Sequence, residues 1–186
     1  LDGAEVTVST MAQGTRRNYY AGDGFQIVDI PYDGEELSMA IILPDPGRFL
    51  EIEETLDGPT VARALSTLEE AFVDLSLPKF GFETSLDLTS TLRDLGMDDA
   101  MAGGKADFSG IDGTRNISIS SVLQKTFIAV DEYGTEAAAA TVVIGPGAVP
   151  DRVEFTVDRP FLFLIRDVPT GTVLFLGRVT HPTGAR

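Results

Sequence analysis

The sequence has no cysteine and only one histidine, His181, close to its C-terminal end. The absence of cysteine excludes disulfide bonds, thiolate nucleophiles and zinc sites with cysteine ligands. A Ser/His catalytic centre would have to be built from the tail of the chain, and a solvated tail histidine is the simpler interpretation. The chain also lacks the HExxH, Walker A, GxSxG and GxGxxG motifs. It therefore carries no signature of the common hydrolases, nucleotide-binding proteins or dehydrogenases.

Long apolar runs and basic residues are also scarce. No run reaches the roughly 18 apolar residues that a membrane span needs, and Leu1 to Met11 has neither the basic start nor the apolar centre of a signal peptide. The 14 Lys and Arg are outnumbered by 29 Asp and Glu, which gives a formal net charge of -15. This charge repels phosphate backbones, so we expect no nucleic acid as a partner. Because no apolar run is long enough, we also expect no membrane partner. No cofactor is expected. The compartment stays open, because a chain without cysteine carries no redox signal.

Carboxylates are plentiful, and several stand side by side, for example Asp98 with Asp99 and Glu69 with Glu70. Paired acids could serve glycoside hydrolysis or Ca²⁺ binding. In a chain this acidic, however, neighbouring acids usually form solvated faces. A hydrolase is therefore a distant alternative.

The 186 residues, 43% of them hydrophobic, suffice for one sizeable core, and their pattern is mostly that of β-strands. Apolar residues that alternate or follow one another predict strands over 5–10, 25–32, 37–44, 72–84, 117–132, 159–167 and 172–180. The second and third of these flank the turn sequence Asp-Gly-Glu-Glu, as the strands of an antiparallel hairpin do. The last two are almost continuously apolar, which predicts burial on both faces.

Helical spacing of apolar residues is confined to two segments. One is 60–70, and the other is 86–95, for which Thr89 or Asp87 could provide the N-terminal cap. The chain has no internal repeat and no linker of shifted composition. The sequence therefore predicts few helices and no domain boundary.

One segment fits neither pattern: four consecutive alanines stand between an acidic start and a Gly/Pro-rich end within 130–155. Alanine has the highest helix propensity, so a helix that begins at Thr135 and ends before Gly145 is one interpretation. If the segment were extended, Thr135 and every second residue after it would form an uncharged face, and Glu136 would lie on the other face. Such a strand could slide between two existing strands, because nothing bulky or charged would have to pass. Periodicity alone does not separate the two interpretations.

Four stretches of the sequence together resemble one known family. VDEYGTEAAAAT (130–141) resembles the hinge of a reactive-centre loop, and FTVDRPFLFLIRDVPTGTVLFLGRVTHP (155–182) is similar to the C-terminal signature of the same family. LSLPKFGFETSLDLTSTLRDLGM (75–97), followed by ADFSGI (106–111), matches the family's order of strand, helix and loop. The family is that of the serpins, and a prokaryotic member is expected.

The resemblance implies an α+β serpin fold, limited to its C-terminal half: β-sheets B and C, part of sheet A and few helices. Residues 1–186 would be part of a single domain, and 134–150 would form the reactive-centre loop. The family's domain is considerably longer than this chain. We therefore expect the N-terminal half of the same serpin as a partner, either as a preceding part of a longer polypeptide or as an associated piece.

The function that the resemblance implies is suicide inhibition of serine proteases. The protease attacks the loop and forms an acyl-enzyme, and the hinge then inserts into sheet A and traps the covalent complex. The matching hinge residues are Gly134, Thr135, Glu136, Ala137, Ala138, Ala139, Ala140 and Thr141. Counting forward from the hinge places the attacked bond between Ala148 and Val149, with Gly147 and Ala148 as the alternative. Alanine before the bond suits elastase-like or subtilisin-like proteases and excludes trypsin-like ones.

Three more residues match positions that support insertion in the family. Lys79 and Glu132 match a basic and an acidic residue of the breach, where insertion begins, and could form an ion pair. Gln124 stands where the family often has a shutter histidine, so a hydrogen-bonded shutter could persist without its pH dependence. Two alternatives remain: a non-inhibitory serpin, against which the intact hinge sequence argues, and a truncated serpin-like binding module without trapping activity.

Overall fold

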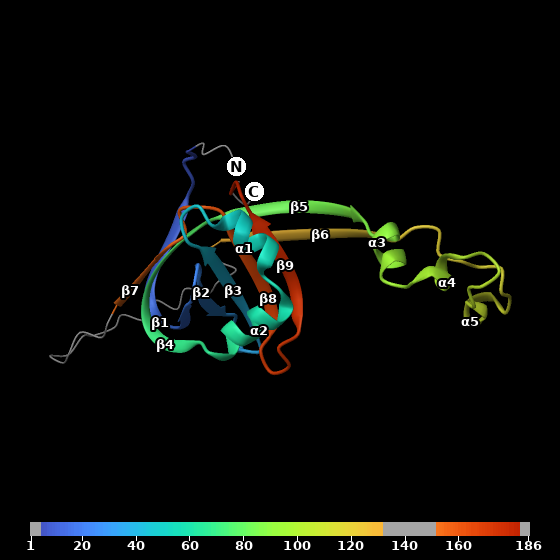
Figure 1. Ribbon diagram of the computed structural model, residues 1–186, viewed down its shortest axis with the longest axis horizontal. Helices are drawn as coiled ribbons and strands as arrows, with labels where there is room; N and C mark the ends of the chain where they lie inside the picture. Colours follow the sequence, from blue (N-terminus) through green and yellow to red (C-terminus); the bar gives the residue numbers. More distant parts are fainter. Residues whose placement is uncertain (1–4, 132–151, 183–186) are drawn as a thin grey trace. The chain divides into compact units, whose positions relative to one another are not determined.

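A computed structural model describes residues 5–131 and 152–182; the remaining stretches are 1–4, 132–151 and 183–186. The chain divides into two compact units, whose elements are labelled in Figure 1. Unit 1 comprises Leu1–Gly81 and Ala129–Arg186, and unit 2 comprises Phe82–Ile128. No change of composition accompanies the division, which is why the sequence predicts no boundary there.

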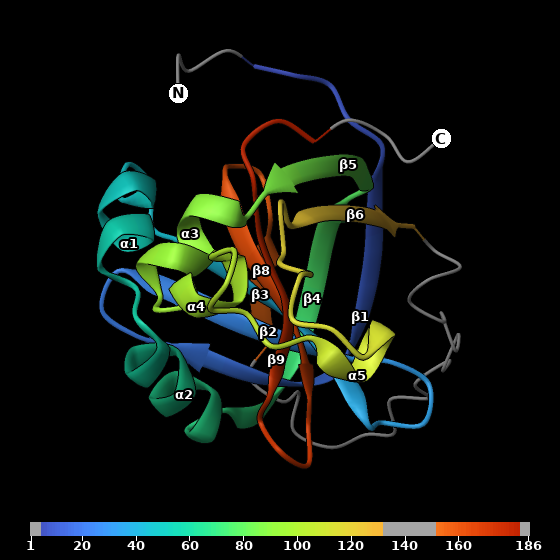
Figure 2. The same ribbon diagram turned by 90° about the vertical axis from the view of Figure 1, so that its right-hand side faces the viewer.

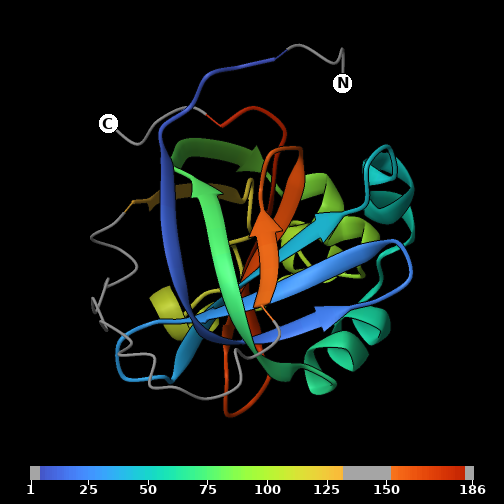
Figure 3. The ribbon, with the colours of Figure 1, turned by 90° about the vertical axis from the view of Figure 1, so that its left-hand side faces the viewer.

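Unit 1 is built on a seven-stranded sheet in the order β7-β4-β1-β2-β3-β8-β9. The strands are β1 (Thr10–Ala21), β2 (Phe25–Pro31), β3 (Leu37–Pro44), β4 (Glu69–Pro78), β7 (Arg152–Thr156), β8 (Phe161–Asp167) and β9 (Val173–Val179). β4 and β7 run parallel, and the other neighbours are antiparallel. The long β1 pairs with β4 from Thr10 to Tyr19 and with β2 from Asn18 to Ala21, so it joins the two parts of the sheet. Figure 3 shows β7, β4 and β1 side by side.

The hairpin that the sequence predicts, β2–β3, is present, and β8 and β9 form a second antiparallel hairpin. In the first turn Gly34 has a φ of 84°, and in the second Gly171 has a φ of 71°. Glycine adopts this left-handed conformation without steric cost. The carboxylate of Asp167 also accepts a hydrogen bond of 2.9 Å from the backbone N–H of Thr170. Both hairpins are thus specified by local turn chemistry, which is visible in the sequence.

Two helices of unit 1, α1 (Phe49–Thr55) and α2 (Gly58–Ser66), cover one face of β2, β3 and β8 (Figure 2). The buried side chains of this core are Phe25, Ile27, Ala40, Ile42, Phe49, Ile52, Ala64, Leu162 and Leu164. Seven of these side chains are Phe, Ile or Leu, and the burial of each is worth roughly 1.5–3 kcal/mol, so this is the main stabilising contact of the helices.

The predicted helix over 60–70 is present as α2 but ends earlier, at Ser66. Its N-terminus is fixed by Asp57, whose carboxylate accepts a 2.9 Å hydrogen bond from the backbone N–H of Thr60. At the other end, Glu69 already belongs to β4, in which alternate side chains are buried in the sheet. The pairing of β4 with β1 therefore takes these last residues away from the helix.

The segment 72–84 is two strands and not the single one that the sequence predicts. β4 ends at Pro78, and after Lys79 the chain continues as β5 (Phe80–Asp87) in a separate two-stranded sheet with β6 (Leu123–Val130). Proline has no N–H to donate to a strand ladder, so the sequence Pro-Lys is a physically reasonable point for the change of sheet.

The predicted strands over 117–132 and 5–10 are also shorter in the structure. Only Leu123–Val130 of the first is strand, because preceding backbone groups are bonded elsewhere. The N–H of Ile119 donates to the carbonyl of Ala100 (3.0 Å), and the N–H of Val122 donates to Oγ1 of Thr89 (2.9 Å). Of 5–10, only Thr10 belongs to a strand.

The described residues of unit 2 form three short helices, α3 (Thr89–Asp94), α4 (Asp98–Met101) and α5 (Ser109–Asp112). The predicted helix over 86–95 begins only at Thr89, because Asp87 ends β5. The N-cap position is Leu88, which makes no side-chain cap hydrogen bond, so neither predicted residue occupies it. One residue earlier, the carboxylate of Asp87 accepts a 2.9 Å hydrogen bond from the backbone N–H of Thr89. No helix in the described ranges is long and apolar enough to cross a bilayer.

The predicted burial of the last strand, β9, is wrong for the described part of the chain. Its apolar residues Val173 to Leu176 are between 44% and 69% exposed. β8, which has the same kind of sequence, is buried from Phe161 to Leu164. The difference arises because the core cluster that α1 and α2 form with the sheet includes Leu162 and Leu164 of β8 but no residue of β9.

Candidate functional site

The predicted loop lies outside the described residues, so the candidate site consists of the strands at its two ends. The hinge (134–141), both candidate bonds (147–148 and 148–149) and Glu132 belong to 132–151. β6 leads into this segment and β7 follows it. What the structure describes is how firmly each end is held.

At the first end, β6 belongs to unit 2 up to Ile128 and to unit 1 in its last two residues. Its last residue, Val130, is buried, whereas Phe127 earlier in the strand is exposed. β6 pairs with β5 in the two-stranded sheet, and the ammonium of Lys125 lies 2.5 Å from the carboxylate of Glu83 on β5. Within the described residues β5 is the only strand that pairs with β6, so the other edge of β6 has no strand beside it.

At the second end, β7 is fastened to the edge of the seven-stranded sheet. It pairs in parallel with β4 from Arg152 to Thr156, and the N–H of Val157 donates to the carbonyl of Ser76 (2.8 Å). Phe155 is buried, and its ring lies 6.3 Å from that of Tyr19 in an edge-to-face arrangement. The chain therefore re-enters the fold through a well-anchored strand.

Lys79 and Gln124, the two described residues of the predicted breach and shutter, lie in different units. Lys79 is partly buried between β4 and β5, and its backbone N–H donates to the carbonyl of Ser9 (2.8 Å). Gln124 is exposed on β6, and its Nε2 lies 3.5 Å from Oγ1 of Thr126. The ion pair with Glu132 and the shutter role stay predictions.

A buried ion pair in the sheet was not predicted from the sequence. Nη2 of Arg166 on β8 donates to Oδ2 of Asp29 on β2 (2.7 Å), and Nε donates to Oγ of Ser38 (3.0 Å). The side chains of Arg166 and Asp29 are only 12% and 6% exposed. The sequence does contain one sign of this pair: Asp29 is the single charged residue of the apolar strand FQIVDIP, and a charge in such a strand indicates a buried partner.

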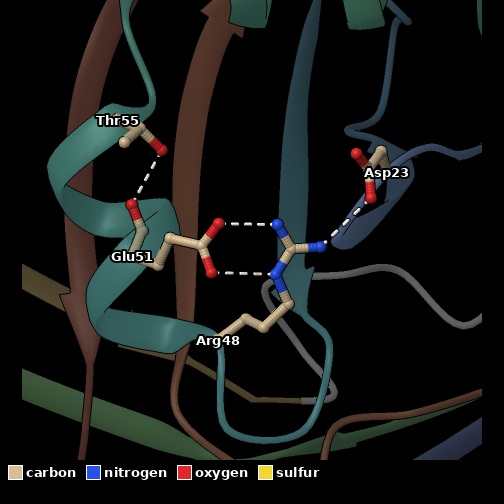
Figure 4. Close-up of polar contacts among 4 residues, drawn as sticks. All are labelled: Asp23, Arg48, Glu51 and Thr55. Carbon is tan, nitrogen blue, oxygen red and sulfur yellow. Dashed lines mark hydrogen bonds and ion pairs between the residues drawn. The ribbon is translucent and has the colours of Figure 1, made fainter.

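A second polar cluster ties the β1–β2 turn to α1 (Figure 4). The guanidinium of Arg48 donates twice to the carboxylate of Glu51 (2.6 and 3.0 Å) and once to Asp23 (3.1 Å). The hydrogen bond to Glu51, followed by that to Asp23, raises the pKa of Arg48, and the same bond lowers the pKa of Glu51. Because all three side chains are solvent-accessible and each carboxylate is paired with the one guanidinium, we interpret this cluster as structural.

Comparison with known proteins identifies the family. The family model of Serpin (serine protease inhibitor) matches residues 1–182. An uncharacterized serpin-like protein of Thermococcus kodakarensis is 41% identical over 181 residues, which cover 95% of this chain and 42% of that protein. The leukocyte elastase inhibitor of Homo sapiens is 42% identical over 171 residues, which cover 84% of this chain and 44% of that protein. The solved structure of a thermophilic serpin, tengpin, in the native state matches with a TM-score of 0.75 at 34% identity and covers 94% of this chain and 46% of that chain.

These matches bear on the predicted fold. The chain spans less than half the length of the relatives that it matches. The α+β serpin fold that the sequence predicts is confirmed: the described residues form a seven-stranded sheet, a two-stranded sheet and few helices, as part of that fold. A family match over nearly the whole chain, together with this fold, shows that the chain belongs to the serpin family.

Proposed function

We propose that this chain is the C-terminal half of an inhibitory serpin that traps serine proteases as covalent acyl-enzymes. One observation carries the proposal: a hinge sequence of small residues, 134–141, stands between two strands whose ends are anchored. The buried Val130 precedes it, and the buried Phe155 follows it. Cleavage of the bait bond should release only one of the two ends of the loop from the fold. Both ends must therefore be held by the fold before cleavage.

The hinge is suited to insertion as a strand. Thr135 and every second residue after it up to Gly145 are uncharged, so this face could enter a sheet without burying a charge. β6 is the strand from which the hinge continues, and its side away from β5 has no neighbour in the described part of the chain. The inserted hinge would form the next strand along that side, in competition with hydrolysis of the acyl-enzyme.

Lys79 and Gln124 are proposed to support this step. Lys79 lies where the chain leaves the seven-stranded sheet for the β5–β6 pair, which is a suitable place for an ion pair with Glu132 at the start of insertion. Gln124 both donates and accepts hydrogen bonds, so it could replace the histidine of the family's shutter.

The target is proposed to be an elastase-like or subtilisin-like protease. The bond between Ala148 and Val149, or that between Gly147 and Ala148, presents a small residue to the primary pocket of the protease. A small pocket accepts alanine or glycine, whereas the trypsin-like pocket needs a cation. A relative at 42% identity is named leukocyte elastase inhibitor, which is in keeping with this class.

The N-terminal half of the same serpin is the proposed second partner. The exposed apolar side chains of β9 and of β6, with Leu176 and Phe127 at 69% each, are of the kind that a folded protein covers. The matched relatives have more than half of their length beyond this region.

The test is to incubate the full-length parent protein with pancreatic elastase and with subtilisin, and to analyse the products by denaturing gels and mass spectrometry. We expect a covalent complex that survives denaturation and a released peptide that identifies the bond. Cleavage in 132–151 without a complex would contradict the proposal. A melting temperature that does not rise after cleavage of the loop would instead favour a non-inhibitory serpin or a binding module.

A further inference from the structure

Arg152, the first described residue after 132–151, is held in place on the outward face of the sheet. Its guanidinium carbon lies 4.5 Å from the centroid of the Phe72 ring, and its Nη1 lies 3.6 Å from Oδ2 of Asp74. Its backbone is opposite Phe72 in the parallel ladder of β7 and β4. An arginine so restrained loses less rotamer freedom on binding a partner than a free one does.

Gly14 on β1 makes room for this arrangement. A Cβ atom at residue 14 would lie 2.5 Å from Oδ1 of Asp74 and 3.3 Å from a ring carbon of Phe72. Any side chain there would therefore displace the two groups that hold Arg152. These contacts form one cluster across three strands, which we call the Arg152 platform. It consists of Gly14 on β1, Phe72 and Asp74 on β4, and Arg152 on β7.

The Arg152 platform is accessible, and Arg152 follows the proposed bait bond closely in the sequence. The side chains of Arg152 and Asp74 are 46% and 42% exposed. Arg152 follows Val149 by three residues, a stretch that spans at most about 10 Å. Protease–inhibitor complexes bury about 800 Å² on each partner, far more than one peptide bond offers. A protease bound at that bond must therefore also contact residues further along the chain, and Arg152 is within reach of such a contact.

We propose that Arg152 is a specificity-determining residue that binds a carboxylate of the target protease on the leaving-group side of its substrate cleft. The inference rests on the proposed function. A guanidinium stacked on an aromatic ring keeps its edge available for a bidentate carboxylate contact, and arginine is enriched among interface anchors. With a formal charge of -15, the chain as a whole repels an acidic partner. A restrained cation such as Arg152, close in sequence to the bait residues, would favour the approach of a carboxylate there.

The experiment compares Arg152→Ala, Arg152→Lys and Arg152→Glu with the unchanged full-length protein. Each is mixed with pancreatic elastase and with subtilisin, and the second-order rate at which the intact loop disappears is measured, counting complex and cleaved product together. We expect Arg152→Ala to be about fivefold slower with at least one protease, Arg152→Glu slower still and Arg152→Lys intermediate. The differences should shrink at high salt, because complementary charges act chiefly on association.

Arg178→Ala is the matched control. Arg178 is an exposed arginine at the opposite edge of the sheet, on β9, and forms one ion pair, with Glu53 (2.6 Å). Its removal should leave the rate unchanged. Rates for Arg152→Ala and Arg152→Glu within twofold of the parent with both proteases would overturn the proposal. Rates that depend on Arg152 without any covalent complex would support it and count against the inhibitory function instead.

Discussion

Unit 1 and unit 2 differ in how they bury their apolar residues. In unit 1, Ile27 and Ile42 have no exposed surface, and two helices cover the sheet around them. In unit 2, Leu123 and Phe127 on β6 are 74% and 69% exposed, and the helices have only four to six residues each. Helices this short contribute little stability without tertiary packing. Unit 1 therefore holds its own core, whereas the strands of unit 2 offer surface that another element could cover.

This difference in burial between unit 1 and unit 2 is in keeping with the proposed insertion of the hinge as a strand. A sheet that accepts an additional strand must have a strand with an unpaired edge. The strands that anchor the two ends of the loop must stay in place during insertion. β6 has an open side within the described part of the chain, and β7 and the core beneath it are closely packed. The following predictions test this contrast.

The largest expected effect is on trapping. Thr135→Arg in the full-length protein would place a long cation on the inward face of the hinge, whose burial is costly. We expect the covalent complex to be lost and the loop to be cleaved as a substrate, with a melting temperature within about 1 °C of the parent because unit 1 is untouched. Thr135→Ser is the control and should preserve the complex. A complex formed at the parent's yield by Thr135→Arg would contradict insertion at this residue.

The next effect concerns the buried ion pair of unit 1. Arg166→Ala removes the partner of a buried carboxylate, Asp29, and should cost about 3–5 kcal/mol in the free energy of unfolding. The double change Asp29→Asn with Arg166→Met should recover much of this loss, because no unpaired charge stays buried. Urea unfolding of both variants provides the measurement. Equal loss in the single and double variants would show that packing and not charge dominates.

A pair of phenylalanines compares the two units directly. In the 186-residue chain, Phe161→Ala removes a ring that is 1% exposed and should cost about 3–5 kcal/mol. Phe127→Ala removes an exposed ring from β6 and should change the free energy of unfolding by less than about 0.5 kcal/mol. Denaturant unfolding tests both. A much larger cost of Phe127→Ala in the longer parent protein would mean that another part of the polypeptide covers this side of β6.

The smallest effect concerns two aspartates whose carboxylates accept a backbone N–H at the start of a helix: Asp57, the N-cap of α2 in unit 1, and Asp87, which precedes the N-cap of α3 in unit 2. Hydrogen bonds from the side chain and then the backbone of Thr60 lower the pKa of Asp57, and those of Thr89 lower the pKa of Asp87. A lowered pKa in the folded state stabilises the fold above the unfolded pKa, and this contribution is lost as the pH falls through the folded value. Asp57→Ala should lower the melting temperature by about 2 °C at neutral pH, and the difference should shrink below about pH 4.

Asp87→Ala is the counterpart in unit 2. It should leave the main thermal transition in place and reduce only the amide protection of α3, since unit 2 contributes less to the core. Melting curves and hydrogen exchange across this pH range test both variants. A drop in the main transition for Asp87→Ala equal to that for Asp57→Ala would show that the units unfold together.

Several elements were predictable from the sequence because their signals are local. The β2–β3 and β8–β9 hairpins follow from turn residues such as Gly34 and Gly171. The cap of α2 follows from the spacing of Asp57 and Thr60. The division of 72–84 at Pro78 was missed, because strand alternation continues across it and only the choice of partner strand changes.

The candidate site was predictable only in part. Its hinge and bait residues came from a resemblance between linear motifs, and their roles stay proposals. The Arg152 platform could not be read from the sequence, because Gly14, Phe72 and Arg152 are brought together by strand pairing between distant segments. The same is true of Asp29 and Arg166, which are 137 residues apart along the chain.

The sequence by itself thus determined the family, the hairpins and the kinds of element, because short-range turn chemistry, residue alternation and linear motifs are properties of neighbouring residues. The tertiary structure alone decided which apolar strands are buried. β8 and β9 have nearly the same composition, yet Leu164 is buried and Leu176 is exposed. The two leucines are opposite each other in the β8–β9 ladder, so the difference comes from what packs over them: the core cluster of α1 and α2 includes Leu164 but no residue of β9. Which layer covers a strand is decided by the tertiary fold and not by the strand's own residues.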